Sequence, residues 1–85
     1  MATPEHRLPS ELQAAGQALR TLFGNRLMAA REAAGLSQTA LAERAGMDAG
    51  RVAAIEAGTV PTMVLSEMVE LALHVGQDVS ELVKE

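Results

Sequence analysis

The stretch LSQTALAERAGMDAGRVAAIEAG, residues 36–58, decides how this chain folds. Small and apolar residues recur in it at spacings of three and four, as they do on one face of an α-helix. Gly46 divides the stretch, and glycine readily takes the positive φ angle that a tight reversal of the chain requires. Ser37 and Asp48 stand where helix N-cap residues are expected, and Gly58 stands where a helix ends. The stretch therefore predicts two short helices joined by a sharp turn.

The apolar residues of this stretch predict how the two helices pack. Four of them are expected to face inward and to fill the angle between the helices: Leu41, Ala45, Val52 and Ile55. Ala42 is small, which lets the second helix approach the first closely. Two helices that cross steeply over a turn of three or four residues are typical of a helix-turn-helix motif.

The rest of the chain is also predicted to be helical. Its 85 residues suffice for one domain, alanine is abundant, and proline occurs only at positions 4, 9 and 61. We expect an all-α fold, a compact bundle of five short helices with an extra N-terminal helical extension. Residues 1–9 are interpreted as a flexible arm, residues 10–20 as the extension, and residues 21–85 as the helix-turn-helix domain.

An apolar stripe runs through the first predicted helical region. Its members recur at steps of three or four: Leu12, Ala15, Leu19, Phe23, Leu27, Ala30 and Ala34. Gly24 lies inside this run and is a candidate for a break between two helices. Within residues 10–20 the stripe has two interpretations. It either extends the core of the same chain, or it pairs with the same helix of a second subunit.

Several function classes receive no support from the sequence. The absence of cysteine excludes disulfides and thiolate metal sites, and His6 and His74 lack further ligands at a suitable spacing for a metal. Ser37, Thr39 and Ser66 have no base placed with them, so we expect no enzyme and no cofactor. No apolar run approaches the ~20 residues that span a bilayer, and the N-terminus lacks the pattern of a signal peptide. A soluble cytoplasmic protein is expected.

Charge is unevenly distributed along the chain. The net charge is −4, yet residues 1–58 hold six basic and six acidic side chains and are neutral. The deficit lies in residues 59–85, where we expect four acidic residues to form a solvated face: Glu67, Glu70, Asp78 and Glu81. Four methionines are expected to fill gaps in the core: Met28, Met47, Met63 and Met68.

Residues 23–82 resemble the phage-repressor (Cro/C1, or XRE) family of helix-turn-helix domains. The resemblance rests on Arg26-Leu27, Arg31-Glu32, Gly35-Leu36-Ser37-Gln38, Leu41-Ala42, Gly46-Met47, Val52, Ile55-Glu56, Gly58, Leu71-Ala72, Val75-Gly76, Val79 and Leu82. It implies a five-helix bundle, often dimeric, that binds double-stranded operator DNA through the helix of residues 48–57. It also implies that Arg31 and Glu56 form a structural pair that braces the first helix against this recognition helix.

The resemblance further implies which residues contact DNA. The expected set is Gln38, Thr39, Asp48, Ala49, Gly50, Arg51, Ala53, Ala54 and Thr59. Gln38 matches a residue that contacts the DNA backbone in relatives, and Thr39 is expected to add a contact to a phosphate. The small residues of the second helix stand at positions that read bases in relatives. Arg51 is expected to reach a phosphate or a neighbouring base.

The reading positions leave two functions open. Bidentate recognition of guanine needs Arg or Lys and that of adenine needs Asn or Gln, and none of these occupies the reading positions. A homodimeric DNA-binding regulator would then depend on Arg51, methyl contacts, DNA shape and an arm that carries His6 and Arg7. The alternative is a protein-interaction module or an antitoxin-type component, whose smooth Ala/Gly face accepts a helix of a partner such as a toxin.

Overall fold

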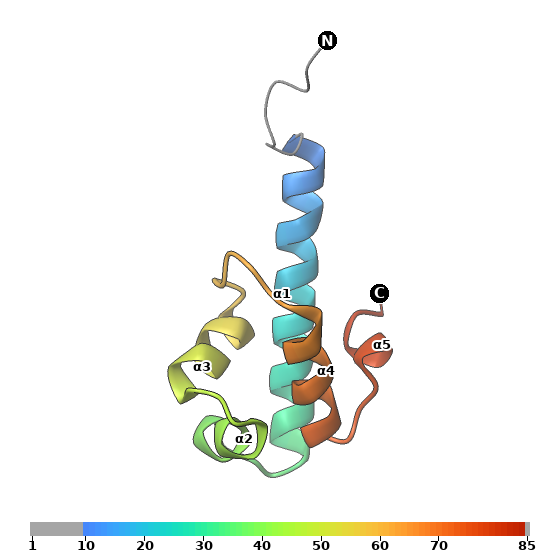
Figure 1. Ribbon diagram of the computed structural model, residues 1–85. Coiled ribbons are helices and arrows are strands. Elements are labelled where there is room, and N and C mark those ends of the chain that lie inside the picture. The colour runs from blue at the N-terminus through green and yellow to red at the C-terminus, as the bar shows by residue number, and fades with distance from the viewer. Residues whose placement is uncertain (1–9, 85) are drawn as a thin grey trace.

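The computed structural model describes residues 10–84, which form five helices joined by short turns (Figure 1). The helices are α1 (Ser10–Ala33), α2 (Gln38–Ala45), α3 (Ala49–Ala57), α4 (Leu65–His74) and α5 (Val79–Leu82). This described part contains no strand, and the predicted all-α class is confirmed. The flexible arm predicted for residues 1–9 lies outside the described residues.

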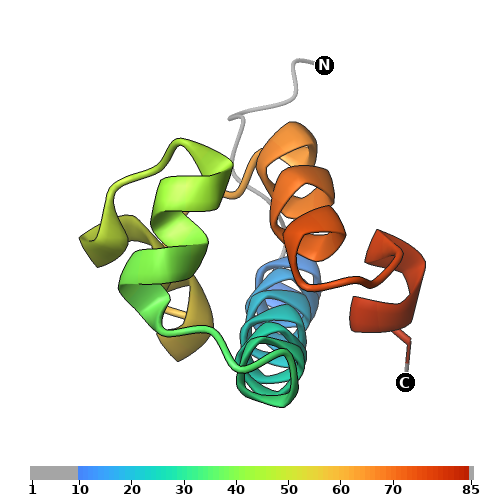
Figure 2. The same cartoon turned by 90° about the horizontal axis from the view of Figure 1, so that it is seen from below.

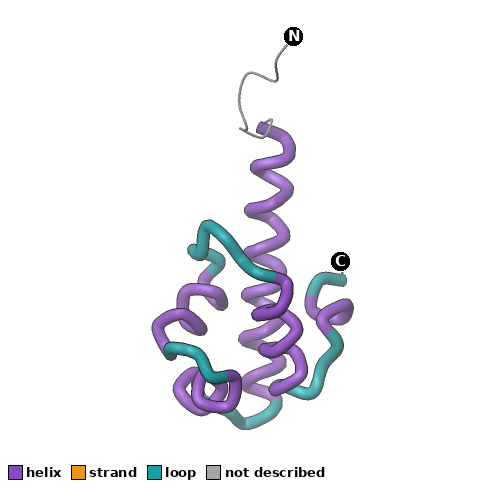
Figure 3. Tube along the Cα trace, viewed as in Figure 1, coloured by secondary structure: helices purple, strands orange, loops and turns teal. Residues whose placement is uncertain are grey.

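The long helix α1 is the spine of the bundle. Seen along α1 in Figure 2, α2 and α3 lie on one side of it, and α4 and α5 lie on the other. α1 packs against α3 and α5, while α2 packs against α3 and α4. Figure 3 shows how the connections between helices run over the outside, with the segment from α3 to α4 crossing α1.

The core lies where these helices converge. Its largest fully buried side chains are Phe23, Leu27, Leu41, Val52, Ile55 and Leu71. Met47, Met63 and Met68 pack against this core as predicted. The same prediction is wrong for Met28, which is 38% exposed because it lies on a face of α1 that no other helix covers.

The predicted turn between α2 and α3 forms by local rules. The side-chain oxygen of Ser37 accepts a hydrogen bond from the N–H of Ala40 at 3.0 Å, and Asp48 accepts one from Gly50 at 2.9 Å. Each side chain thus satisfies an N–H group that the first turn of its helix leaves unpaired. Gly46 has a φ angle of 68°, which reverses the chain directly after α2.

Gly24 does not break the first helix, contrary to that interpretation of the sequence. α1 is one helix of 24 residues, and it passes so close to α3 that a Cβ atom on Gly24 would overlap the carbonyl oxygen of Ile55. The same Cβ would lie 2.7 Å from the carbonyl oxygen of Glu56. The glycine is therefore required by a close helix crossing rather than by a change of direction.

The start of α1 projects beyond the bundle (Figure 1). Ala15 is exposed and Leu19 is 46% exposed, so the interpretation that these residues extend the core is wrong. Gln17 connects this segment to the bundle, because its side-chain amide donates hydrogen bonds to the carbonyl oxygen of Gly58 at 3.0 Å and to the hydroxyl of Thr21 at 3.2 Å. The extension is thus a continuation of the first helix, not a separate one.

We predict that Gly24→Ala lowers the free energy of unfolding by about 1–3 kcal/mol, because the added methyl group meets backbone atoms that cannot move aside cheaply. Gly16→Ala is the matched control in the same helix, since its new Cβ would lie 3.5 Å from Nη1 of Arg20, an ordinary contact. The control should gain about 0.5–1 kcal/mol from helix propensity. Urea unfolding of both variants measures the difference, and equal gains at the two sites would contradict the close crossing.

Candidate functional site

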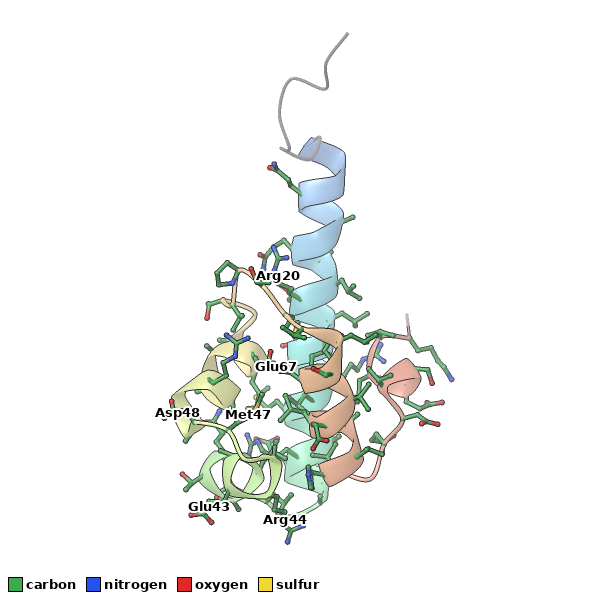
Figure 4. All side chains as sticks on the ribbon, in the orientation of Figure 1. Arg20, Glu43, Arg44, Met47, Asp48 and Glu67 are labelled. Carbon is green, nitrogen blue, oxygen red and sulfur yellow. The ribbon has the colours of Figure 1, made fainter. Side chains whose placement is uncertain are left out.

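The α2–turn–α3 unit presents one side of α3 to solvent. Leu41, Val52 and Ile55 are fully buried between the helices, as the sequence predicts. The N–H of Met47 donates to the carbonyl oxygen of Ala42 at 2.8 Å, which closes the turn. Figure 4 shows Met47 and Asp48 in this turn, between α2 and α3. Since the apolar side of α3 faces inward, its opposite side forms the outer surface of the unit.

This outward side of α3 carries very small side chains. Gly50 is exposed and Ala53 is partly exposed, whereas Ala49 and Ala54, which are also partly exposed, pack at the same time against the hydrophobic core. Methyl groups and backbone are all that these four residues offer to a partner. Such a surface can contact a thymine methyl or lie close to another flat surface, but its side chains cannot donate or accept a hydrogen bond.

A buried ion pair holds the helices of the unit in place. Nε of Arg31 lies 2.6 Å from Oε2 of Glu56, and Nη2 lies 3.1 Å from Oε1. Nη1 of Arg31 donates to the carbonyl oxygen of Leu36 at 2.7 Å. The hydrogen bonds that Arg31 donates to Glu56 raise the pKa of Arg31 above its ordinary value, although burial opposes this shift. The pair joins α1 to α3 and to the segment that leads into α2.

Gln38 belongs to this same network. Its side-chain amide donates to Oε1 of Glu56 at 2.9 Å, so the amide nitrogen expected at a DNA phosphate is directed toward α3. Thr39, the next residue of α2, is exposed. Thr59 donates its hydroxyl to the carbonyl oxygen of Ala54 at 3.2 Å and so satisfies the end of α3. Of these three side chains, only Thr39 is turned to solvent without a hydrogen bond to the protein.

Arg51 is paired with a residue that sequence reasoning did not connect to it. Its Nη2 lies 2.7 Å from Oε1 of Glu67 and its Nε lies 3.1 Å from Oε2, while Nη2 also lies 3.3 Å from the carbonyl oxygen of Thr62. These hydrogen bonds from Arg51 lower the pKa of Glu67, against the effect of its partial burial. Glu67 is therefore not part of a solvated face, and that prediction is wrong for this residue.

The remaining acidic residues of the predicted face, Glu70, Asp78 and Glu81, are exposed. His74 occupies the last turn of α4 as predicted, and its Nε2 lies 3.5 Å from Oε1 of Glu70. Within residues 10–84, no cluster of three or more acidic or histidine side chains is placed to hold a metal ion. In the same range, no helix combines the length and the apolar character that crossing a membrane requires.

Comparison with known proteins agrees with this architecture. A family model described as a helix-turn-helix domain matches residues 22–83. The crystal structure of a hypothetical transcription factor, NHTF, from Neisseria is similar, with a TM-score of 0.73 and 26% sequence identity. That similarity covers 98% of this chain and 88% of the other, so it extends beyond residues 22–83 into the projecting part of α1. No curated protein matches the chain significantly.

We predict that Glu56→Leu lowers the free energy of unfolding by about 3–5 kcal/mol, because it leaves the Arg31 charge buried without a counterion. The double variant Arg31→Met/Glu56→Leu should be more stable than Glu56→Leu alone, since it buries no charge. Chemical denaturation of the wild type, both single variants and the double variant measures this coupling. Glu32→Gln is the control: Glu32 is exposed and 4.0 Å from Arg31, and its loss should cost less than about 1 kcal/mol. A double variant less stable than both single ones would contradict the argument.

Proposed function

Because the chain belongs to the family of helix-turn-helix domains, we propose that it is a DNA-binding transcriptional regulator of the Cro/C1 type that binds operator DNA as a homodimer. The observation that carries the proposal is the outward side of α3, whose small residues leave room for close contact with a duplex. The similar structure from Neisseria is described as a hypothetical transcription factor, which supports the same function. Such a regulator acts in the cytoplasm.

In this proposal α3 lies in the major groove, with Ala49, Gly50, Ala53 and Ala54 against the bases. Their methyl groups favour thymine, and the remaining specificity comes from the sequence-dependent shape of the DNA. The start of α2 lies against the DNA backbone, where Thr39 and the N–H groups of the first turn suit a phosphate oxygen. Asp48 contributes by capping α3 and so fixing where the helix begins.

The homodimer is supported by the projecting start of α1. This segment exposes Leu19 and small residues on a helix that extends past the other four, and a second copy would cover them. Closed pairs of identical chains are two-fold symmetric, so the operator would be partly palindromic.

A second function is favoured by a different surface. Leu65, Val69 and Leu73 recur at every fourth residue of α4, and they are 67%, 37% and 62% exposed. An apolar stripe of this kind suits a helix of another protein. A component of the antitoxin type would bind DNA through α3 and a partner protein through α4.

Selection of bound duplexes from random DNA tests the main proposal, and we expect one partly symmetric motif to be enriched. Ala53→Glu should reduce binding more than about tenfold, because it places a carboxylate against the phosphates and fills the groove-facing side of α3. Ala29→Glu is the matched control, since Ala29 is exposed on α1. Uniform weak retention of all sequences, or equal losses in both variants, would favour the protein-interaction function.

The homodimer is tested by measuring mass in solution for Leu19→Glu and Leu73→Glu. We expect Leu19→Glu to convert a dimer into a monomer, because it buries a charge in the proposed contact. Leu73→Glu should remain dimeric, because Leu73 lies on α4. A dimer that survives Leu19→Glu but not Leu73→Glu would place the contact on α4 instead, and a wild-type monomer would refute the homodimer.

A further inference from the structure

Arg51 is the one basic residue on α3, and it is neutralised by Glu67. We propose that Glu67 is a positioning residue that withholds Arg51 from the DNA backbone, so that carboxylate and phosphate compete for the same guanidinium. The inference rests on the proposed DNA-binding function and identifies the residue that limits the strength of binding. Its partner is the phosphate of the duplex beside α3.

The geometry of the pair supports a stable but reversible restraint. Arg51 donates to both carboxylate oxygens of Glu67, at 2.7 and 3.1 Å, and this two-pronged arrangement is the one that a phosphate would also use. A third hydrogen bond, to the carbonyl oxygen of Thr62 at 3.3 Å, directs the guanidinium toward the segment before α4. Three donors on Nε and Nη2 are thereby occupied within the protein.

The position of the pair allows DNA to compete for it. The Arg51 side chain is 36% exposed and the Glu67 side chain 25% exposed, so the pair lies at the surface rather than in the core. Arg51 is in the first turn of α3, directly after Ala49 and Gly50 of the proposed reading side. A phosphate near that turn would be within reach of the side chain once the carboxylate releases it.

Three other arginines of the described residues are engaged elsewhere or lie away from the start of α3. Arg31 is buried and paired with Glu56, and Arg44 lies in the last turn of α2, at the opposite end from the proposed phosphate contacts. Arg20 donates to the side chain of Gln17 on the projecting helix. The charge available beside the reading side of α3 therefore depends on whether Glu67 holds Arg51.

The test measures how binding to a labelled duplex of mixed sequence depends on salt. Glu67→Gln keeps the shape of the side chain and an oxygen that accepts from Arg51, but it removes the competing charge. We expect the slope of log affinity against log salt to steepen by about 0.9 per subunit, which is one additional phosphate contact. Between about 50 and 200 mM salt, the affinity of this variant should fall about threefold more per subunit than that of the wild type, or about tenfold more for the proposed homodimer.

Two further variants separate this mechanism from a general change of charge. Glu70→Gln removes the same charge from the same helix at an exposed position and should leave the slope unchanged. In Arg51→Ala/Glu67→Gln the slope should return to that of the wild type, because the released cation is gone. Circular dichroism and thermal unfolding check that each variant is folded at the temperature of the binding experiment. A loss of structure alone would lower the affinity for the duplex, but it would not steepen the slope of log affinity against log salt.

The outcomes are distinct. If Glu67→Gln behaves like Glu70→Gln, or if its steeper slope persists without Arg51, the wild type binds DNA but Glu67 does not control Arg51. If no folded variant and no wild-type protein binds the duplex, the proposed function fails and this inference fails with it. A steeper slope that requires Arg51 supports both.

Discussion

The contact between the Arg31 guanidinium and the Glu56 carboxylate fixes the arrangement on which the rest of the structure depends. It joins the last turn of α1 to the last turn of α3, and through Leu36 and Gln38 it also fixes the start of α2. Burying a charge pair costs free energy, and separating the two partners costs more because each charge is then buried without its counterion. The pair therefore favours a single mutual orientation of these helices. The outward side of α3 faces solvent because this orientation leaves it there.

Local chemistry explains why so much of the motif was predictable. Ser37 and Asp48 cap the helices that they precede, and the chain reverses at Gly46, because capping and positive φ angles depend on neighbours in sequence. Helical periodicity likewise predicted the fully buried Leu41 and Ile55. The family resemblance, confirmed by the match over residues 22–83, extended this prediction to the whole bundle.

Features that depend on contacts between distant segments were not predictable in the same way. A glycine within a helical pattern is compatible with a break in the helix and also with a close crossing of two helices. Only the position of α3 shows that Gly24 allows a close crossing. Leu19 continues the periodic stripe of Phe23 and Leu27, but it lies in the part of α1 that projects beyond the other helices, so no helix covers it. The pairing of Arg51 with Glu67 spans sixteen residues and a turn, and no spacing rule connects them.

The backbone contact at Gly24 gives the projecting helix a mechanical role. α1 and α3 meet there without an intervening side chain, and the Arg31–Glu56 pair lies two turns further along the same helix. Tilting one of these helices therefore carries the other with it. In the proposed complex with DNA, a second subunit bound to the projecting part of α1 would therefore also set the angle at which α3 meets the duplex, so that assembly and DNA binding would be geometrically coupled.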